Sequence, residues 1–134
     1  MAKAYAILRN TTAQTITGGI VSPGAAVHGF GCACGGRTIQ INGNNINLRE
    51  GGYYEIIVGA TVTDSEPGNV TMSVLQDGNV VGSGSTAIAA AADPGMIAFP
   101  AGVKVNCNSV ITIEVTASAG NPTVNTIYTT VKKV

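Results

Sequence analysis

Apolar and polar residues alternate at two-residue spacing along most of this chain, and no other feature of the sequence restricts its fold so strongly. The clearest run spans 53–63, in which one face would carry Tyr54, Ile56, Val58, Ala60 and Val62. Successive side chains of a β-strand point to opposite faces, so this run predicts a half-buried strand with one apolar side. Hardly any segment has the periodicity of an amphipathic helix.

Two turn sequences predict β-hairpins. Asp77-Gly78 follows the strand expected at 70–74, and Asp-Gly is favoured where both turn residues need a positive φ. The Asn-Gly-Asn-Asn run at 42–45 separates two shorter apolar segments in the same way. Short strands joined by Gly-rich or Asn-rich turns, without helices between them, are typical of sandwiches and barrels.

The rest of the chain divides between further strands and irregular connections. Alternation predicts strands at 111–117 and 124–131, whereas the glycine-rich segment Gly18–Gly36 is expected to be a long loop with one irregular strand. We interpret Gly82–Thr86 as a flexible connection between strands. With no linker and no internal repeat, residues 1–134 are expected to form a single domain.

Charge is scarce in this sequence. Only 10% of the residues are charged, against roughly 25% in a typical soluble domain, and the formal net charge is zero. Either Asn, Thr, Ser and Gly cover the exposed surface, or much of it is buried against other copies, and both explanations stay open. The longest basic run is Lys132-Lys133, so the long-range field that attracts nucleic acid or an anionic membrane is missing. Neither is an expected partner.

The N-terminal segment does not predict secretion. Its apolar stretch before Arg9 is shorter than that of a signal peptide, and no segment approaches the ~20 apolar residues of a membrane span. We therefore expect the protein to be made and folded in a cytoplasm. The cysteines agree, because their number is odd and the spacing of Cys32 and Cys34 does not suggest a disulfide framework.

One cluster has the residue types of a metal site. Imidazole and thiolate are the usual ligands of zinc, and four such groups would complete a tetrahedral site if the fold brought them together. The weak candidates are His28, Cys32, Cys34 and Cys107. Their spacing matches no common zinc pattern, and cysteine also serves as a small buried hydrophobe, so we predict no metal and no other cofactor.

The sequence contains few residues in arrangements that are typical of catalytic sites. His28 is the only histidine, and nothing around the serines resembles a nucleophile elbow. Asp64, Glu66, Asp77 and Asp93 all fall in expected turns, where acidic side chains are usually solvated rather than paired across a cleft. We therefore predict that the protein is not an enzyme and has no catalytic residue.

Two motifs, in this order, resemble a known family. Gly52–Ala60 is a Gly-aromatic-Tyr strand with inward apolar residues, and Val74–Ser83 contains an apolar start, Asp-Gly, two valines and Gly-Ser. This combination resembles the trimeric jelly rolls related to tumour necrosis factor and the complement globular head, and most of all the bacterial branch at the ends of collagen-like exosporium glycoproteins. The ending Ile127–Val134 is similar to that family's final strand, which packs near the trimer axis.

The resemblance covers roughly Asn45 to Val134. It implies an all-β, antiparallel jelly-roll sandwich that assembles as a homotrimer, with Tyr53 and Tyr128 as candidates for the subunit interface. The expected core consists of Tyr54, Ile56, Val58, Val74, Ile111 and Ile113. Proteins with this fold bind very different partners, so the resemblance does not imply a ligand.

Relatives carry collagen stalks or signal segments, and these 134 residues contain neither. This difference predicts a virion component made in the host cytoplasm, such as a phage capsid decoration or head-fibre protein. We expect a non-enzymatic structural homotrimer that docks on a capsid or another surface lattice, with residues 1–12 as an N-terminal docking arm. The alternative is an adhesin of a cell or spore surface, binding a glycan or host receptor through the loops Asp64–Gly68 and Ala92–Gly95.

Overall fold

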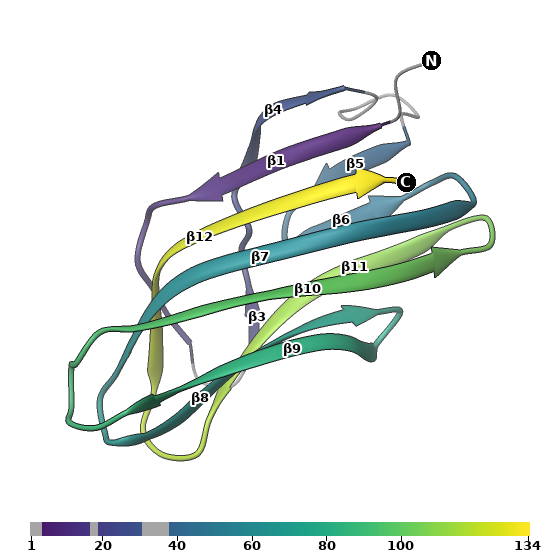
Figure 1. Cartoon of the computed structure of the whole chain (residues 1–134). Helices are drawn as coiled ribbons and strands as arrows, with labels where there is room; N and C mark the ends of the chain where they lie inside the picture. Colours follow the sequence, from purple (N-terminus) through teal and green to yellow (C-terminus); the bar gives the residue numbers. More distant parts are fainter. Residues whose placement is uncertain (1–3, 17–18, 31–37) are drawn as a thin grey trace.

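A computed structural model of the chain describes residues 4–16, 19–30 and 38–134. In these residues, twelve strands form two antiparallel sheets that pack face to face (Figure 1). The described residues contain no helix. The strands are β1 (Tyr5–Asn10), β2 (Gln14–Thr15), β3 (Gly19–Val21), β4 (Ala25–Phe30), β5 (Ile39–Asn42), β6 (Asn45–Leu48), β7 (Gly52–Asp64), β8 (Gly68–Gln76), β9 (Asn79–Ile88), β10 (Gly95–Val105), β11 (Ser109–Ala117) and β12 (Pro122–Lys133). The predicted all-β sandwich is confirmed.

The chain changes sheets repeatedly, which gives the sandwich its jelly-roll topology. The first sheet has the order β10-β7-β12-β1-β4, with β2 also paired to β12. The second has the order β5-β6-β11-β8-β9, with β3 beside β11. Strands from the two ends of the sequence are therefore neighbours, as where β1 pairs with β12 and the Lys133 N–H donates to the Ala4 carbonyl at 2.8 Å.

Alternating side chains fill the space between the two sheets. In β7 every second residue from Tyr54 to Val62 is buried, and those between them face outward, as the periodicity predicted. All six residues expected in the core are at most 2% exposed, so this prediction is confirmed: Tyr54, Ile56, Val58, Val74, Ile111 and Ile113. The core is a single apolar layer shared by both sheets.

Both predicted hairpins are present. Asp77 and Gly78 join β8 to β9 with φ angles of 50° and 88°, the left-handed values that an Asp-Gly turn supplies. Gly43, with φ of 62°, lies in the turn between β5 and β6. The turn sequences therefore predicted these two hairpins correctly.

The expectation of a docking arm over residues 1–12 needs correction. Tyr5–Asn10 forms β1, which pairs with β12 on one side and β4 on the other. Ala6 and Leu8 point into the core and are fully buried. This segment is part of the sandwich because its own alternation supplies two core side chains, whereas residues 1–3 lie outside the described residues.

Two segments that we expected to be irregular contain strands. The described part of Gly18–Gly36 includes β3 and β4, and Gly82–Thr86 lies within β9. The glycines of β9 face the neighbouring edge strand β10, where a side chain would collide with Ala101 or Phe99. They therefore allow a close approach of two strands rather than flexibility.

Candidate functional site

The outer face of the first sheet carries a group of exposed apolar side chains. Four of the large ones are Tyr53, Ile57, Met96 and Tyr128, with exposed fractions of 61%, 45%, 77% and 50%. They come from β7, β10 and β12, which are adjacent in the sheet. Together with Ala98 and Pro100, which are also exposed on β10, we call these residues the association face.

Strand register places these side chains in rows across the sheet. One row contains Ala98, Gly59 and Tyr128, and the next contains Pro100 and Ile57. A Cβ built on Gly59 would meet no atom within 4 Å, so the Tyr128 ring stands beside an open patch of backbone. The two rows thus place apolar side chains of β7, β10 and β12 next to one another, with Arg9 of β1 beside Tyr128 at the end of the first row. Gathered apolar side chains suit burial against another protein surface.

A charged row crosses the association face near the start of β7, where Glu55 lies between Ile57 and Tyr53 and is paired with Lys132 of β12. Lys132 Nζ lies 3.9 Å from Glu55 Oε1, and both side chains are about half exposed. Lys104 Nζ lies 5.9 Å from the centre of the Tyr53 ring. Exposed pairs of this kind contribute little stability, and the Glu55–Lys132 row separates Tyr53 from the apolar rows of the association face.

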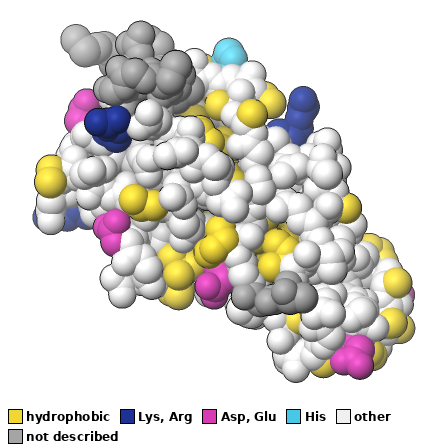
Figure 2. Space-filling view, turned by 180° about the vertical axis from the view of Figure 1, so that it is seen from behind, with side chains coloured by type: hydrophobic (Ala, Val, Ile, Leu, Met, Phe, Trp, Pro, Cys, Tyr) yellow, Lys and Arg dark blue, Asp and Glu magenta, His cyan; other side chains and the backbone are white. Residues whose placement is uncertain are grey.

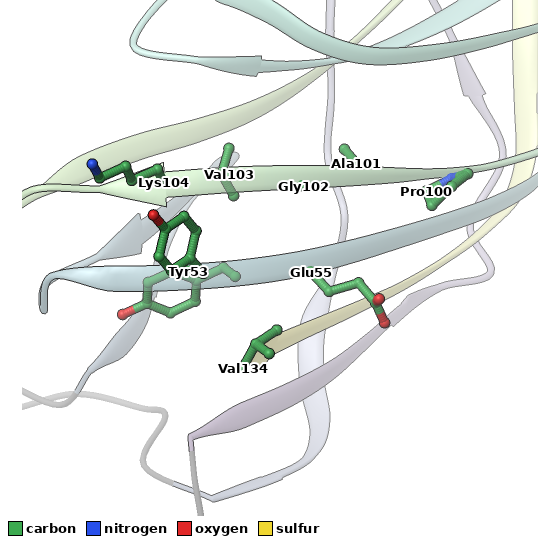
Figure 3. A pocket seen from close by; sticks show the side chains of 9 residues that line it. Tyr53, Glu55, Pro100, Ala101, Gly102, Val103, Lys104 and Val134 are labelled. Atoms are coloured by element: carbon green, nitrogen blue, oxygen red, sulfur yellow. The ribbon is translucent and has the colours of Figure 1, made fainter.

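A shallow hollow lies at this same end of the association face (Figure 3). It has a volume of about 420 Å³, and its walls include Tyr53, Pro100, Lys104 and Val134. Gly102 lies between Pro100 and Lys104 along β10, and a Cβ there would meet no atom within 4 Å. The missing side chain leaves this part of the sheet open.

The outer face of the second sheet differs in composition. Figure 2 looks at the molecule from behind and shows scattered hydrophobic and charged side chains among broad areas of uncharged polar groups and backbone. Register places short hydroxyl side chains side by side here, with Ser73 opposite Ser83 and Thr71 opposite Ser85. This face also exposes the apolar residues Ile20, Val80 and Val110, which lie on three different strands.

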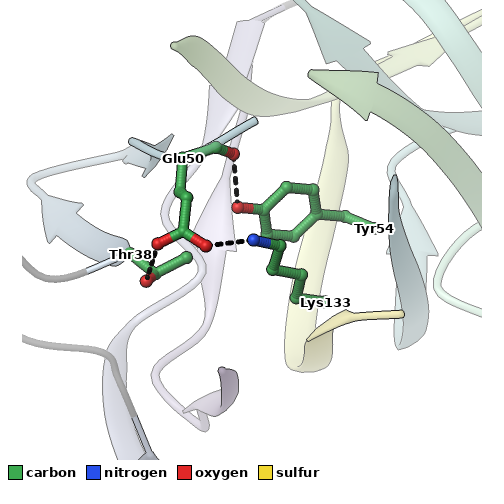
Figure 4. A network of polar contacts seen from close by, with 4 residues as sticks. All are labelled: Thr38, Glu50, Tyr54 and Lys133. Atoms are coloured by element: carbon green, nitrogen blue, oxygen red, sulfur yellow. Dashed lines mark hydrogen bonds and ion pairs between the residues drawn. The ribbon is translucent and has the colours of Figure 1, made fainter. Parts of the chain in front are cut away.

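A network of polar contacts joins the C-terminal strand to the segments around β5 and β6 (Figure 4). Glu50 accepts from Lys133 Nζ and, at 3.2 Å, from the Thr38 hydroxyl. The Tyr54 hydroxyl donates to the Glu50 carbonyl at 2.7 Å. The hydrogen bond from Lys133, followed by that from Thr38, lowers the pKa of Glu50, and burial raises the pKa of Tyr54.

The proposed metal ligands are not brought together in the part of the molecule that is described. His28 is an exposed residue of β4, where its ring lies 5.7 Å from that of Tyr5. Cys107 is exposed after the end of β10, and β4 and β10 are opposite edges of the first sheet. Among described residues, no group of three or more His, Cys, Asp or Glu could hold a metal. Cys32 and Cys34 lie outside the described residues.

The two loops proposed for glycan recognition do meet at one end of the sandwich. The Ala92 N–H donates to the Asp64 carbonyl at 2.8 Å, and the Asn121 N–H donates to Ser65 Oγ at 2.9 Å. Asp64 is only 2% exposed, and its Oδ1 accepts from the Glu66 N–H at 3.1 Å. Asp64 therefore stabilises its own turn, whereas Glu66 and Asp93 are exposed.

These features define an all-β jelly-roll sandwich with a group of exposed apolar side chains on the outer face of its first sheet. Among solved structures, the chain is similar to Eiger TNF from S. frugiperda, with a TM-score of 0.76 and 10% sequence identity over 100% of this chain and 94% of the other. It is also similar to murine APRIL at pH 5.0, with a TM-score of 0.67 and 12% identity over 96% of this chain and 98% of the other. The fold is thus the TNF-like jelly roll.

Comparisons of sequence add no family to this fold. No family model matches the chain, and no curated protein matches it. In the described residues, no helix is long and apolar enough to cross a membrane. The motifs at Gly52–Ala60 and Val74–Ser83 thus identified the fold correctly, although identity to the solved structures is low.

Proposed function

We propose that this chain is a non-enzymatic structural module that assembles as a homotrimer through the association face. The observation that carries the proposal is the group of exposed apolar side chains on three adjacent strands of the first sheet. Ile57, Met96 and Tyr128 are 45%, 77% and 50% exposed there. Exposed apolar groups gathered on one face mark an interaction surface, and the TNF-like fold favours threefold association.

The solution mass tests this proposal. Light scattering at micromolar concentration should give a mass near three times 13.4 kDa for the unmodified chain. Ile57→Asp should reduce the mass to that of one chain, because the change places a charge in the middle of the association face. Ser73→Asp, on the outer face of the second sheet, is the matched control and should leave the trimer intact. A monomeric unmodified chain would contradict the proposal.

We propose further that the trimer attaches to a larger assembly, in first place a phage virion, where it acts as a capsid decoration or head fibre. The outer face of the second sheet, where Ser73 lies opposite Ser83 and Thr71 opposite Ser85, supports a role as an exposed surface of such a lattice. The alternative is a module of a spore or cell surface, as in the exosporium branch. Mass spectrometry of purified virions and of surface fractions separates the two, since the chain should be recovered from only one of them.

A further inference from the structure

A second hollow, on the opposite side of the molecule from the association face, is polar instead of apolar. It has a volume of about 210 Å³ and is open to solvent on the second sheet. Its walls are three amide side chains, one guanidinium and one small apolar side chain: Gln40, Asn47, Asn108, Arg49 and Val110. A hollow of this size has room for several water molecules or for one small polar ligand unit.

Strand register builds this hollow from three adjacent strands. Gln40 of β5, Asn47 of β6 and Val110 of β11 form one row across the sheet. Their neighbours Ile39, Leu48 and Ile111 are fully buried, so the row faces outward. Arg49 and Asn108 lie one residue beyond the paired Leu48 and Ser109, which places them in the next row at about 7 Å along the strands.

The Arg49 guanidinium has N–H donors that could bind a ligand in the hollow. Its Nη1 donates to Gln40 Oε1 at 2.9 Å, which uses one of five N–H groups and orients the side chain over the hollow. The two ion pairs of the described residues involve Lys132 and Lys133, not Arg49. The neighbouring acid Glu50 is bound by Lys133 and Thr38 instead.

No acidic side chain lines this hollow in the described residues. Beside the hollow, Asp77 Oδ1 accepts from the Val110 N–H at 2.9 Å. The hollow therefore combines one positive charge with amides that both donate and accept hydrogen bonds. This combination matches a ligand that carries one carboxylate and several hydroxyl groups.

We propose that this hollow binds a carboxylated sugar unit, such as a hexuronate. Arg49 would hold the carboxylate, Asn47 and Asn108 would bind ring hydroxyls, and Val110 would contact the apolar side of the ring. The proposal does not rest on trimer formation, because the hollow and the association face lie on different sheets. It moves glycan recognition away from the loops Asp64–Gly68 and Ala92–Gly95.

Titration followed by amide NMR shifts tests the proposal, with glucuronate, glucose and acetate as separate probes. Glucuronate should shift the signals of Gln40, Asn47, Asn108 and Val110 saturably, and more tightly than either other probe. Arg49→Gln should weaken glucuronate binding about tenfold or more, because it replaces a charged donor by a neutral one. Thr112→Ala, outside the hollow on β11, is the matched control and should bind normally.

Any result that differs from these expectations contradicts the proposal in part or as a whole. Equal binding of glucose would remove the role of Arg49, and equal binding of acetate would reduce the site to a carboxylate site. Saturable shifts that map to Asp64–Gly68 instead would restore the loops as the glycan site. No shift at tens of millimolar glucuronate would overturn the proposal, whatever mass light scattering gives for the assembly.

Discussion

Gly84 of β9 lies so close to Phe99 of β10 that a Cβ on the glycine would be 2.9 Å from Phe99 Cδ1. The two strands belong to different sheets, and β9 and β10 are the edge strands on the same side of the sandwich. Gly82 makes the same kind of approach to Ala101, at 2.7 Å. The absence of two side chains thus allows the sheets to close along this side.

Gly84→Val should therefore destabilise the fold by about 1–3 kcal/mol, because the new side chain must displace Phe99 from the core. Urea unfolding at a fixed protein concentration measures this loss. The matched change Ser85→Ala alters the next residue, which faces solvent, and should stay within about 0.5 kcal/mol. Equal stability of the two variants would show that β9 and β10 separate without cost.

Thr129→Val should raise the stability. Thr129 is fully buried on β12, opposite Val58 and Leu8, and its hydroxyl has no hydrogen-bond partner among the described residues. Replacing this hydroxyl by a methyl group of similar size removes a desolvation penalty of about 1 kcal/mol. Thr112→Val on the outer face of β11 is the control. A loss of stability in Thr129→Val would instead reveal a hidden partner for the hydroxyl.

Gly78→Ala should destabilise the hairpin between β8 and β9. Gly78 has φ of 88°, and a side chain in the left-handed region costs about 1–2 kcal/mol. The cost has a purely conformational origin, because a Cβ at this position would meet no atom within 4 Å. Asn79→Ala, at the exposed start of β9, should change stability much less. Differential scanning calorimetry of the two variants side by side distinguishes them.

The contacts of Glu50 should make stability fall at acidic pH. Lys133 and Thr38 lower the folded-state pKa of Glu50 below its usual value of 4.5. A depressed carboxyl pKa contributes stability above the unfolded-state pKa and loses it as the pH falls through the folded-state value. The urea midpoint should therefore decrease between about pH 6 and about pH 3, and Glu50→Gln should flatten this decrease. An unchanged pH profile in the variant would exclude Glu50 as the responsible group.

Much of this fold followed from local sequence alone. Alternation in 53–63 determined which side of β7 is buried, because a strand has a fixed two-residue period, and Asp77-Gly78 determined a hairpin, because few residue pairs adopt its φ angles. The same rule applied to Ile97, Phe99 and Ala101 would have revealed β10, and applied to Ala6 and Leu8 it would have revealed β1.

Tertiary structure decided the rest, because it depends on which strands become neighbours. The sequence makes Tyr128 and Ile57 outward-facing residues of two strands, but only the pairing of β12 with β7 and of β7 with β10 joins them to Ala98 and Pro100 in one face. Likewise, Gln40, Asn47 and Val110 have no common motif. They meet because β5, β6 and β11 are aligned in register, and long-range pairing of this kind is a property of the whole sheet.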